Sequence, residues 1–122
     1  MDIKGVGVDI LRISRIKGVY LNHGERFLYR ICTDQEINYV MRSRETLFDR
    51  LSALFCAKEA VFKTLHTRNS IIFKEIEIVH LPYPVAKLHG KMLHIALQRE
   101  IKNVLVSISH DSDICIAFAI AI

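Results

Sequence analysis

The stretch "ETLFDRLSALFCAKEAVFKTLH", residues 45–66, is predicted to form one long helix around which the rest of the chain folds. Large apolar side chains recur in it at helical spacing and form one wide arc, made of Leu47, Leu51, Leu54, Phe55, Val61, Phe62 and Leu65. Small residues form a second face, on which another element can pack closely: Ala53, Ala57, Ala60 and Thr64. A helix with two such faces is expected to be enclosed on most sides.

A narrow polar stripe runs between the two apolar faces of this helix and is expected to face a cleft. Its members lie within about 80° of one another by helical geometry, and they are Ser52, Cys56, Glu59, Lys63 and His66. Glu59 and Lys63 are four residues apart, which also fits an ordinary exposed ion pair worth about 0.2–0.5 kcal/mol. Lys58 is unusual because it projects from the middle of the apolar arc.

The segment "GVGVDI", residues 5–10, reads as a buried strand that carries a carboxylate, Asp9, where a packing side chain is expected. An unpaired buried carboxylate costs several kcal/mol, so Asp9 needs a positive partner or access to water. Lys63 is one candidate, in a purely structural pair. Alternatively, Asp9 and Glu59 converge on a hard cation such as Mg²⁺, and Lys63 meets a phosphate.

The remaining segments predict an α+β fold, in which a small, mostly antiparallel sheet packs around the long helix with short additional helices. Thr33 and Glu36 have the spacing of a capping box at the start of one of these helices. The sequence "HDSD" fits a tight hairpin between the last two strands. The expected strands cover 3–11, part of 71–80, 85–88, 104–109 and 114–122, and the expected shorter helices cover two parts of 13–31, then 34–43 and 90–99.

Composition points to a single domain over residues 1–122, since this length supports one hydrophobic core. The formal charge of +4 favours an acidic or phosphorylated partner, but no basic run interleaved with aromatic residues suggests nucleic-acid binding. The longest apolar run, residues 114–122, is too short to cross a membrane, and no secretion signal is evident. Three cysteines without a C-x-x-C pattern favour free thiols and a cytoplasmic location.

Four motifs in this order resemble those of holo-acyl-carrier-protein synthase, the small bacterial type of phosphopantetheinyl transferase. They are "GVGVDILRISRI" at 5–16, "FCAKEAVFKTL" at 55–65, "FKEIEI" at 73–78 and "VSISHD" at 106–111. The resemblance implies Mg²⁺-dependent transfer of phosphopantetheine from coenzyme A to a serine of apo-acyl-carrier protein, which releases adenosine 3',5'-bisphosphate. It also implies a role in fatty-acid and lipid biosynthesis, and a homotrimer with active sites between subunits.

The resemblance further implies roles for individual residues. Asp9 and Glu59 would hold Mg²⁺, and Glu59 and Lys63 would be catalytic. Coenzyme A would be bound by Lys63, Ser109 and His110, and the acidic carrier would dock on Arg12 and Arg15. The base that deprotonates the carrier serine stays open between Glu59 and a metal-ordered water. Arg12 and Arg15 equally fit an ordinary solvated helix face, and His110 also fits a structural hydrogen bond at a strand end.

Two departures from the family pattern concern phosphate binding. Leu54 stands where the family often has an arginine, and the loop from His66 to Ser70 lacks the usual glycines. Arg68 could replace a lost contact in that loop. Two other functions compete with the transferase: a metal-dependent phosphoesterase that uses Asp9, Glu59 and Lys63, and a non-catalytic module that binds an acidic protein.

Overall fold

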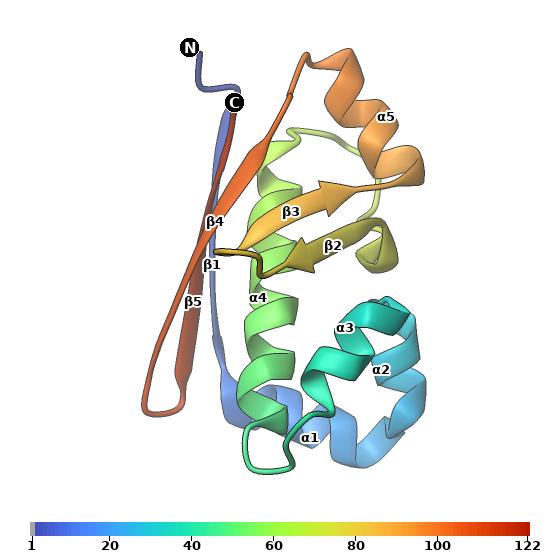
Figure 1. The fold of residues 1–122 in the computed structure, drawn as a ribbon, viewed down its shortest axis with the longest axis vertical. Coiled ribbons are helices and arrows are strands. Elements are labelled where there is room, and N and C mark those ends of the chain that lie inside the picture. The colour runs from blue at the N-terminus through green and yellow to red at the C-terminus, as the bar shows by residue number, and fades with distance from the viewer. Residues whose placement is uncertain (1) are drawn as a thin grey trace.

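The computed structural model describes residues 2–122, and its elements follow the predicted order (Figure 1). The strands are β1 (Gly5–Arg12), β2 (Ile76–Val79), β3 (Val85–Leu88), β4 (Val104–Asp111) and β5 (Ile114–Ala121). The helices are α1 (Ile13–His23), α2 (Glu25–Ile31), α3 (Asp34–Val40), α4 (Leu47–Thr64) and α5 (Gly90–Gln98), with a 3₁₀ turn η1 (Phe73–Glu75). None of the helices within residues 2–122 is long and apolar enough to cross a bilayer.

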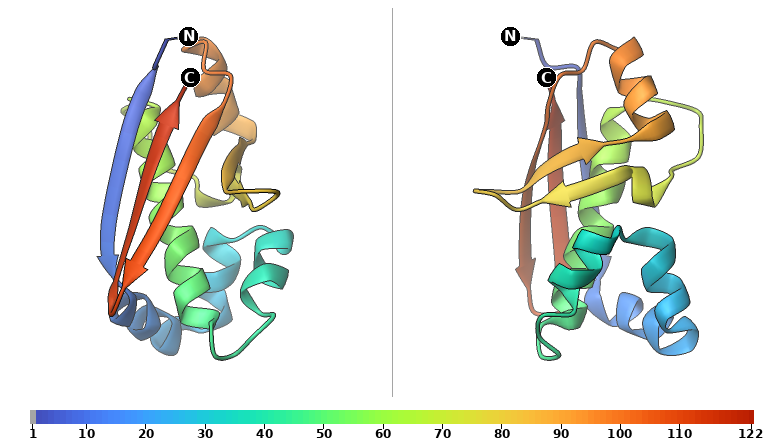
Figure 2. Two further views of the ribbon diagram at one scale, coloured as in Figure 1. Left: turned by 60° about the vertical axis from the view of Figure 1, so that its left-hand side comes forward. Right: turned by 45° about the vertical axis from the view of Figure 1, so that its right-hand side comes forward.

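The five strands form one antiparallel sheet in the order β1-β5-β4-β3-β2. The β4–β5 hairpin has the predicted tight turn, because Asp111 pairs with Ile114 across it. The three long strands lie side by side in front of α4 (Figure 2), and both chain ends lie at the same end of the molecule. The predicted α+β fold with a sheet packed on the long helix is therefore confirmed.

Backbone glycines bring β1 unusually close to α4. A Cβ added to Gly7 would overlap the carbonyl oxygen of Ala60, and one added to Gly5 would overlap that of Thr64. The small residues of α4 and the glycines of β1 therefore form one close contact between two backbones. This contact carries Asp9, the next residue on the same face of β1, to the side of α4.

The opposite face of the long strands is exposed and apolar, since α4 covers only one side of the sheet. Its large side chains are 38% to 62% exposed, and they are Val6, Val8, Ile10, Leu105, Ile116 and Phe118. A contiguous apolar face of this kind is uncommon on a monomer and is typical of an interaction surface.

Hydrogen bonds from side chains fix two helix starts. The predicted capping box at α3 is confirmed, because Thr33 Oγ1 accepts from the Glu36 amide and Glu36 Oε1 accepts from the Thr33 amide. The start of α1 is held by Asp113, whose carboxylate accepts from the Ser14 amide at 2.9 Å and from the Ser14 hydroxyl at 2.6 Å. The hairpin turn between β4 and β5 is thereby tied to the first turn of α1.

Some predicted element bounds were too generous. The helix expected over 34–43 ends at Val40, and the long helix expected over 45–66 spans Leu47–Thr64. The strand expected within 71–80 pairs only over Ile76–Val79, and a 3₁₀ turn precedes it. The Lys58 ammonium binds the carbonyl oxygens of Phe73, the first residue of this turn, and of Ile76, the first residue of β2.

Candidate active site

Asp9, Glu59 and Lys63 come together where the middle of β1 meets the second half of α4. Asp9 lies on the α4 side of β1 because it continues the alternation set by Gly5 and Gly7. Glu59 and Lys63 lie one turn apart on the helix. Two residues separated by 50 positions in the chain, Asp9 and Glu59, are thus neighbours in the fold.

Lys63 reaches β1 through two contacts. Its Nζ donates to the Val8 carbonyl oxygen at 2.7 Å and lies 3.4 Å from Oδ1 of Asp9. The side chain of Lys63 is 49% exposed and that of Asp9 is 19% exposed. Asp9 and Lys63 therefore do form the ion pair that one of the two alternatives predicted, but the pair is open to solvent and not buried. The ordinary Glu59–Lys63 pair is not what forms, because the Lys63 ammonium turns to β1.

The electrostatics of the site centre on the two carboxylates. Burial raises the pKa of Glu59 above its usual range, and the negative charge of Asp9 raises it further. The positive charges of Lys63 and Arg15 partly oppose this rise in the Glu59 pKa. The two carboxylates therefore repel each other, and a cation between them would relieve the repulsion.

The donor set matches Mg²⁺ better than a transition metal. Within residues 2–122 no cluster of three or more His, Cys, Asp and Glu side chains is placed to hold an ion. A closed zinc site would need such a cluster, whereas Mg²⁺ usually takes one or two carboxylates together with water and substrate phosphate. Asp9 and Glu59 are two neighbouring carboxylates that could hold such an ion, and the Lys63 ammonium beside Asp9 is half exposed.

The predicted polar stripe faces solvent only in its second half. Glu59, Lys63 and His66 are partly or fully exposed, as expected, but Ser52 and Cys56 are buried, so the expectation of a cleft along the whole stripe is wrong. The Cys56 thiol donates to the Asp9 carbonyl oxygen at 3.2 Å, behind the carboxylate. A hydrogen bond to Cys115 together with burial raises the pKa of this thiol far above its usual range, so Cys56 stays neutral.

Comparison with known proteins assigns the chain to a family. A sequence profile described as the 4'-phosphopantetheinyl transferase superfamily matches residues 5–119. The chain belongs to this superfamily. It is 39% identical over 123 residues to a holo-[acyl-carrier-protein] synthase of Desulforudis audaxviator, and the match covers 98% of this chain and 93% of that protein.

Solved structures agree with the family assignment. The holo-[acyl-carrier-protein] synthase of Neisseria meningitidis superposes with a TM-score of 0.86 at 30% identity and covers 98% of both chains. The Helicobacter pylori enzyme, solved in complex with coenzyme A, superposes with a TM-score of 0.80 at 25% identity and covers 95% of this chain and 98% of that one. The predicted resemblance to holo-acyl-carrier-protein synthase, and the prediction that the chain is a phosphopantetheinyl transferase, are confirmed.

The S-H motif of this superfamily member lies away from the two carboxylates within one protomer. β5 separates β4 from β1, and two strand spacings amount to about 10 Å. Ser109 lies opposite Ile116 on the outer apolar face, whereas His110 pairs with Cys115 on the side of α4. The single chain therefore brings Asp9, Glu59 and Lys63 together but leaves Ser109 and His110 apart from them.

The two departures from the family pattern have structural explanations. Leu54 is 1% exposed and packs in the core, so its position on α4 does not point toward a phosphate in this chain. His66 follows α4 with a φ of 48°, the left-handed conformation that glycine adopts most easily. The helix end thus keeps a glycine-like backbone without a glycine. Arg68 is exposed in the same loop.

The two arginines predicted to dock a carrier are exposed at the junction of β1 and α1. Arg15 is close enough to Glu59 for its charge to lower the pKa of that carboxyl. Beyond them a hollow of about 460 Å³ lies between α1 and α2, and its lining includes His23, Arg26 and Arg30. Sequence reasoning missed this extension, although His23 lies in the same helix as Arg15, and Arg26 and Arg30 lie in the helix that follows.

Sequence reasoning also left Lys58 unexplained. The Lys58 ammonium is completely buried and binds Glu36, the residue that the sequence assigns first to the capping box. The sequence offered two signals for this ion pair: a lysine in the middle of an apolar helix face, and a carboxylate elsewhere in the chain.

Proposed function

We propose that this chain transfers phosphopantetheine from coenzyme A to a serine of apo-acyl-carrier protein. The serine oxygen forms a bond to the β-phosphorus of coenzyme A, the bond from that phosphorus to the bridging pyrophosphate oxygen breaks, and adenosine 3',5'-bisphosphate leaves. The serine proton passes to a base. The observation that carries the proposal is the meeting of Asp9, Glu59 and Lys63 at the β1–α4 contact in a member of this superfamily.

Asp9 and Glu59 are proposed to hold Mg²⁺, because they are two neighbouring carboxylates open to solvent. When bound, the ion neutralises charge that develops on the pyrophosphate during transfer. Lys63 is held next to Asp9 and carries its ammonium at the solvent-facing edge, where it can steady a phosphate oxygen. Glu59 and a metal-ordered water are the two candidate bases for the serine proton.

A mass-spectrometric assay tests the reaction. The protein is incubated with coenzyme A, Mg²⁺ and an apo-acyl-carrier protein, and the carrier is expected to gain one phosphopantetheine group. A metal-dependent phosphoesterase would instead hydrolyse coenzyme A and leave the carrier unlabelled. A non-catalytic binding module would leave both coenzyme A and the carrier unchanged. Hydrolysis without labelling, or no reaction at all, would overturn the proposal.

Variants of the two carboxylates test their roles. Asp9→Asn and Glu59→Gln are expected to lose nearly all transfer while they remain folded by circular dichroism. Asp49→Asn is the matched control, because Asp49 is an exposed acid on the same helix, and it is expected to keep the full rate. An unchanged rate in Asp9→Asn or Glu59→Gln would contradict the proposed site.

The active assembly is proposed to be a homotrimer with sites between subunits. The exposed apolar face of β1, β5 and β4 supports an assembly that buries it. The position of Ser109 on this face supports coenzyme A binding by Ser109 across the interface. His110, the next residue of β4, is proposed to bind the same ligand from the α4 side of the strand. Phe118→Asp is expected to give monomers by light scattering and to lose transfer, whereas Lys102→Asp, an exposed residue outside that face, leaves both unchanged.

The carrier protein is proposed to dock on Arg12 and Arg15. The docking surface on this chain is proposed to extend into the hollow with Arg26 and Arg30. Acidic carrier side chains would be steered by these charges. Arg26→Glu and Arg30→Glu are expected to raise the KM for the carrier several-fold with little change in kcat, because neither residue touches the carboxylate pair. Equal KM values in these variants and in Lys102→Glu would contradict the docking surface.

The reaction is proposed to take place in the cytoplasm as a step of fatty-acid and lipid biosynthesis. The three cysteines Cys32, Cys56 and Cys115 are all free, as is usual in a reducing compartment.

A further inference from the structure

An ion pair between Glu36 and Lys58 is buried in the core next to α4. Nζ of Lys58 lies 2.7 Å from Oε1 of Glu36, and the side chains of Lys58 and Glu36 are 0% and 2% exposed. The ammonium also donates to the carbonyl oxygens of Phe73 and Ile76, at 2.8 Å and 2.7 Å. A lysine ammonium has three protons, so every one of them has an acceptor.

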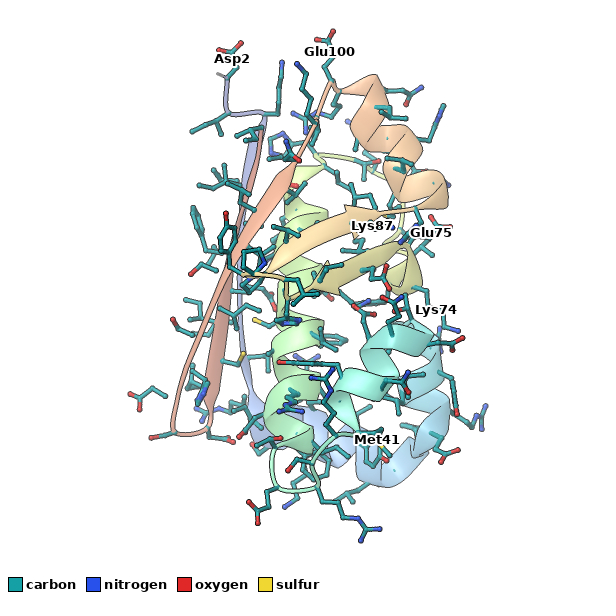
Figure 3. All side chains as sticks on the ribbon, viewed as in Figure 1. Asp2, Met41, Lys74, Glu75, Lys87 and Glu100 are labelled. Atoms are coloured by element: carbon teal, nitrogen blue, oxygen red, sulfur yellow. The ribbon has the colours of Figure 1, made fainter. Side chains whose placement is uncertain are left out.

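The carboxylate of Glu36 is equally well satisfied. Its Oε1 also accepts from the amide of Thr33 at 2.9 Å, and its Oε2 accepts from the amide of Ile78 at 2.8 Å. This one carboxylate therefore connects the start of α3, the middle of α4 and the strand β2. Figure 3 shows the labelled side chains of Lys74 and Glu75 at the turn that precedes β2 and receives the Lys58 ammonium.

Stability alone does not explain a buried ion pair in this place. Replacement of such a pair by apolar residues of similar volume is often neutral or stabilising, because the desolvation of two charges offsets their attraction. The network does fix the position of the helix, since three short hydrogen bonds from Lys58 tie α4 to Glu36 and to the backbone at the start of β2. Two further bonds to the Glu36 carboxylate hold that partner against the start of α3 and against β2. A packed apolar contact would tolerate small rotations of the helix that these bonds do not.

The position of α4 decides where Glu59 points. Glu59 follows Lys58 directly and therefore projects about 100° further around the helix, toward β1. On that side α4 is held by the close contacts of Gly5 and Gly7 with its backbone. The Lys58–Glu36 network holds the opposite side, so the helix is fixed from both directions at the turn that carries Glu59.

We propose that Lys58 and Glu36 are positioning residues, whose buried ion pair holds α4 in the rotation that sets the Glu59 carboxylate opposite Asp9. This inference rests on the proposed function, because it takes Asp9 and Glu59 as the two carboxylates that hold Mg²⁺. Neither Lys58 nor Glu36 touches the substrate or the ion, since both are buried.

The test compares the wild-type protein with Lys58→Met and with the double variant E36Q/K58M, which removes both charges. Binding of Mg²⁺ to each protein with coenzyme A present is measured by isothermal titration, and transfer is measured at saturating coenzyme A and carrier. The double variant is expected to fold, to bind Mg²⁺ about tenfold or more weakly and to lose kcat by a similar factor, as is usual when partners that orient a metal ligand are removed. The KM for the carrier is expected to stay within about twofold.

Glu77→Gln is the matched control for a general loosening of this region. Glu77 is also buried, accepts from the Thr33 hydroxyl and pairs with His89, and its bonds do not involve α4. Glu77→Gln is expected to lower the melting temperature and leave Mg²⁺ binding unchanged. Equal losses of Mg²⁺ binding in Glu77→Gln and in the double variant would overturn the proposal, and so would a folded double variant with wild-type binding and kcat.

Two further variants keep the result interpretable. If E36Q/K58M does not fold, the proposal is tested with Glu36→Asp by the same two measurements, Mg²⁺ binding and transfer. This variant keeps the charge but withdraws the carboxylate from Lys58 by one methylene. Glu59→Gln separates this inference from the proposed function. If Glu59→Gln binds Mg²⁺ as tightly as the wild type, Glu59 is not a ligand and the proposed metal site has failed, whatever Lys58 does.

Discussion

Replacement of Gly7 by alanine is expected to separate β1 from α4 and to disable the site without replacing any of its side chains. The added methyl group would overlap the carbonyl oxygen of Ala60 and would lie 3.0 Å from both the Ala60 carbonyl carbon and Cβ of Lys63. The obstacle is helix backbone, which cannot rotate away as a side chain does. Relief therefore requires the strand to move as a unit.

The size of the effect follows from this geometry. An ordinary contact between carbon and oxygen is about 3.3–3.6 Å, so β1 must shift by more than about 1 Å. Overpacking of this kind typically costs about 1–3 kcal/mol. The hydrogen bond of 2.7 Å from Lys63 to the Val8 carbonyl oxygen would also be lost. We expect Gly7→Ala to lower the free energy of unfolding by about 3 kcal/mol and to reduce transfer by at least about tenfold at a temperature where it is folded.

Urea unfolding at one protein concentration measures the loss of stability. With an m-value of about 2 kcal/mol/M, the midpoint is expected to fall by about 1.5 M. Gly18→Ala is the control, because nothing lies within 4 Å of its added methyl group and Gly18 is inside α1. That variant should gain about 0.5–1 kcal/mol from helix propensity. Midpoints for Gly7→Ala and Gly18→Ala within about 0.3 M of each other would refute the argument about close backbone contact.

Three further predictions concern other parts of the chain. Because the folded-state pKa of Glu59 is raised, the stability that it contributes is present at low pH and is lost as the pH rises through the raised value. Without Mg²⁺, Glu59→Gln should therefore equal the wild type below the ordinary carboxyl pKa and be more stable at neutral pH, as followed by urea unfolding against pH. Thr33→Ala should lose about 1–2 kcal/mol of unfolding free energy, whereas Thr33→Ser keeps the capping oxygen and most of the stability. His66→Gly should gain about 0.5–1 kcal/mol, since His66 has a φ of 48°.

Each of these three predictions has a result that contradicts it. Addition of Mg²⁺ should raise the melting temperature of the wild type and not that of Glu59→Gln, so an equal rise in both would argue against a ligand role for Glu59. A Thr33→Ser variant as unstable as Thr33→Ala would show that the cap does not matter. A loss of stability in His66→Gly would mean that contacts of the imidazole outweigh the strain of its backbone.

The sequence by itself determined the order of elements and the helix on which they pack. The 3.6-residue spacing of Leu47, Leu51 and Leu54 and the two-residue alternation along β1 and β5 are local patterns, so they need no knowledge of distant contacts. The capping box of Thr33 and Glu36 and the tight turn between β4 and β5 are local for the same reason. Ordered motifs were also enough to indicate the family.

Only the tertiary structure decided which polar side chains meet. Lys63 turned to Asp9 and not to Glu59, because the glycines of β1 let that strand lie against α4 within reach of the ammonium. Lys58 pairs with Glu36, 22 positions away in the sequence, and its ammonium also binds the carbonyl oxygens of Phe73 and Ile76. Such pairings depend on how elements are placed in space, and side-chain periodicity within one element carries no record of that placement.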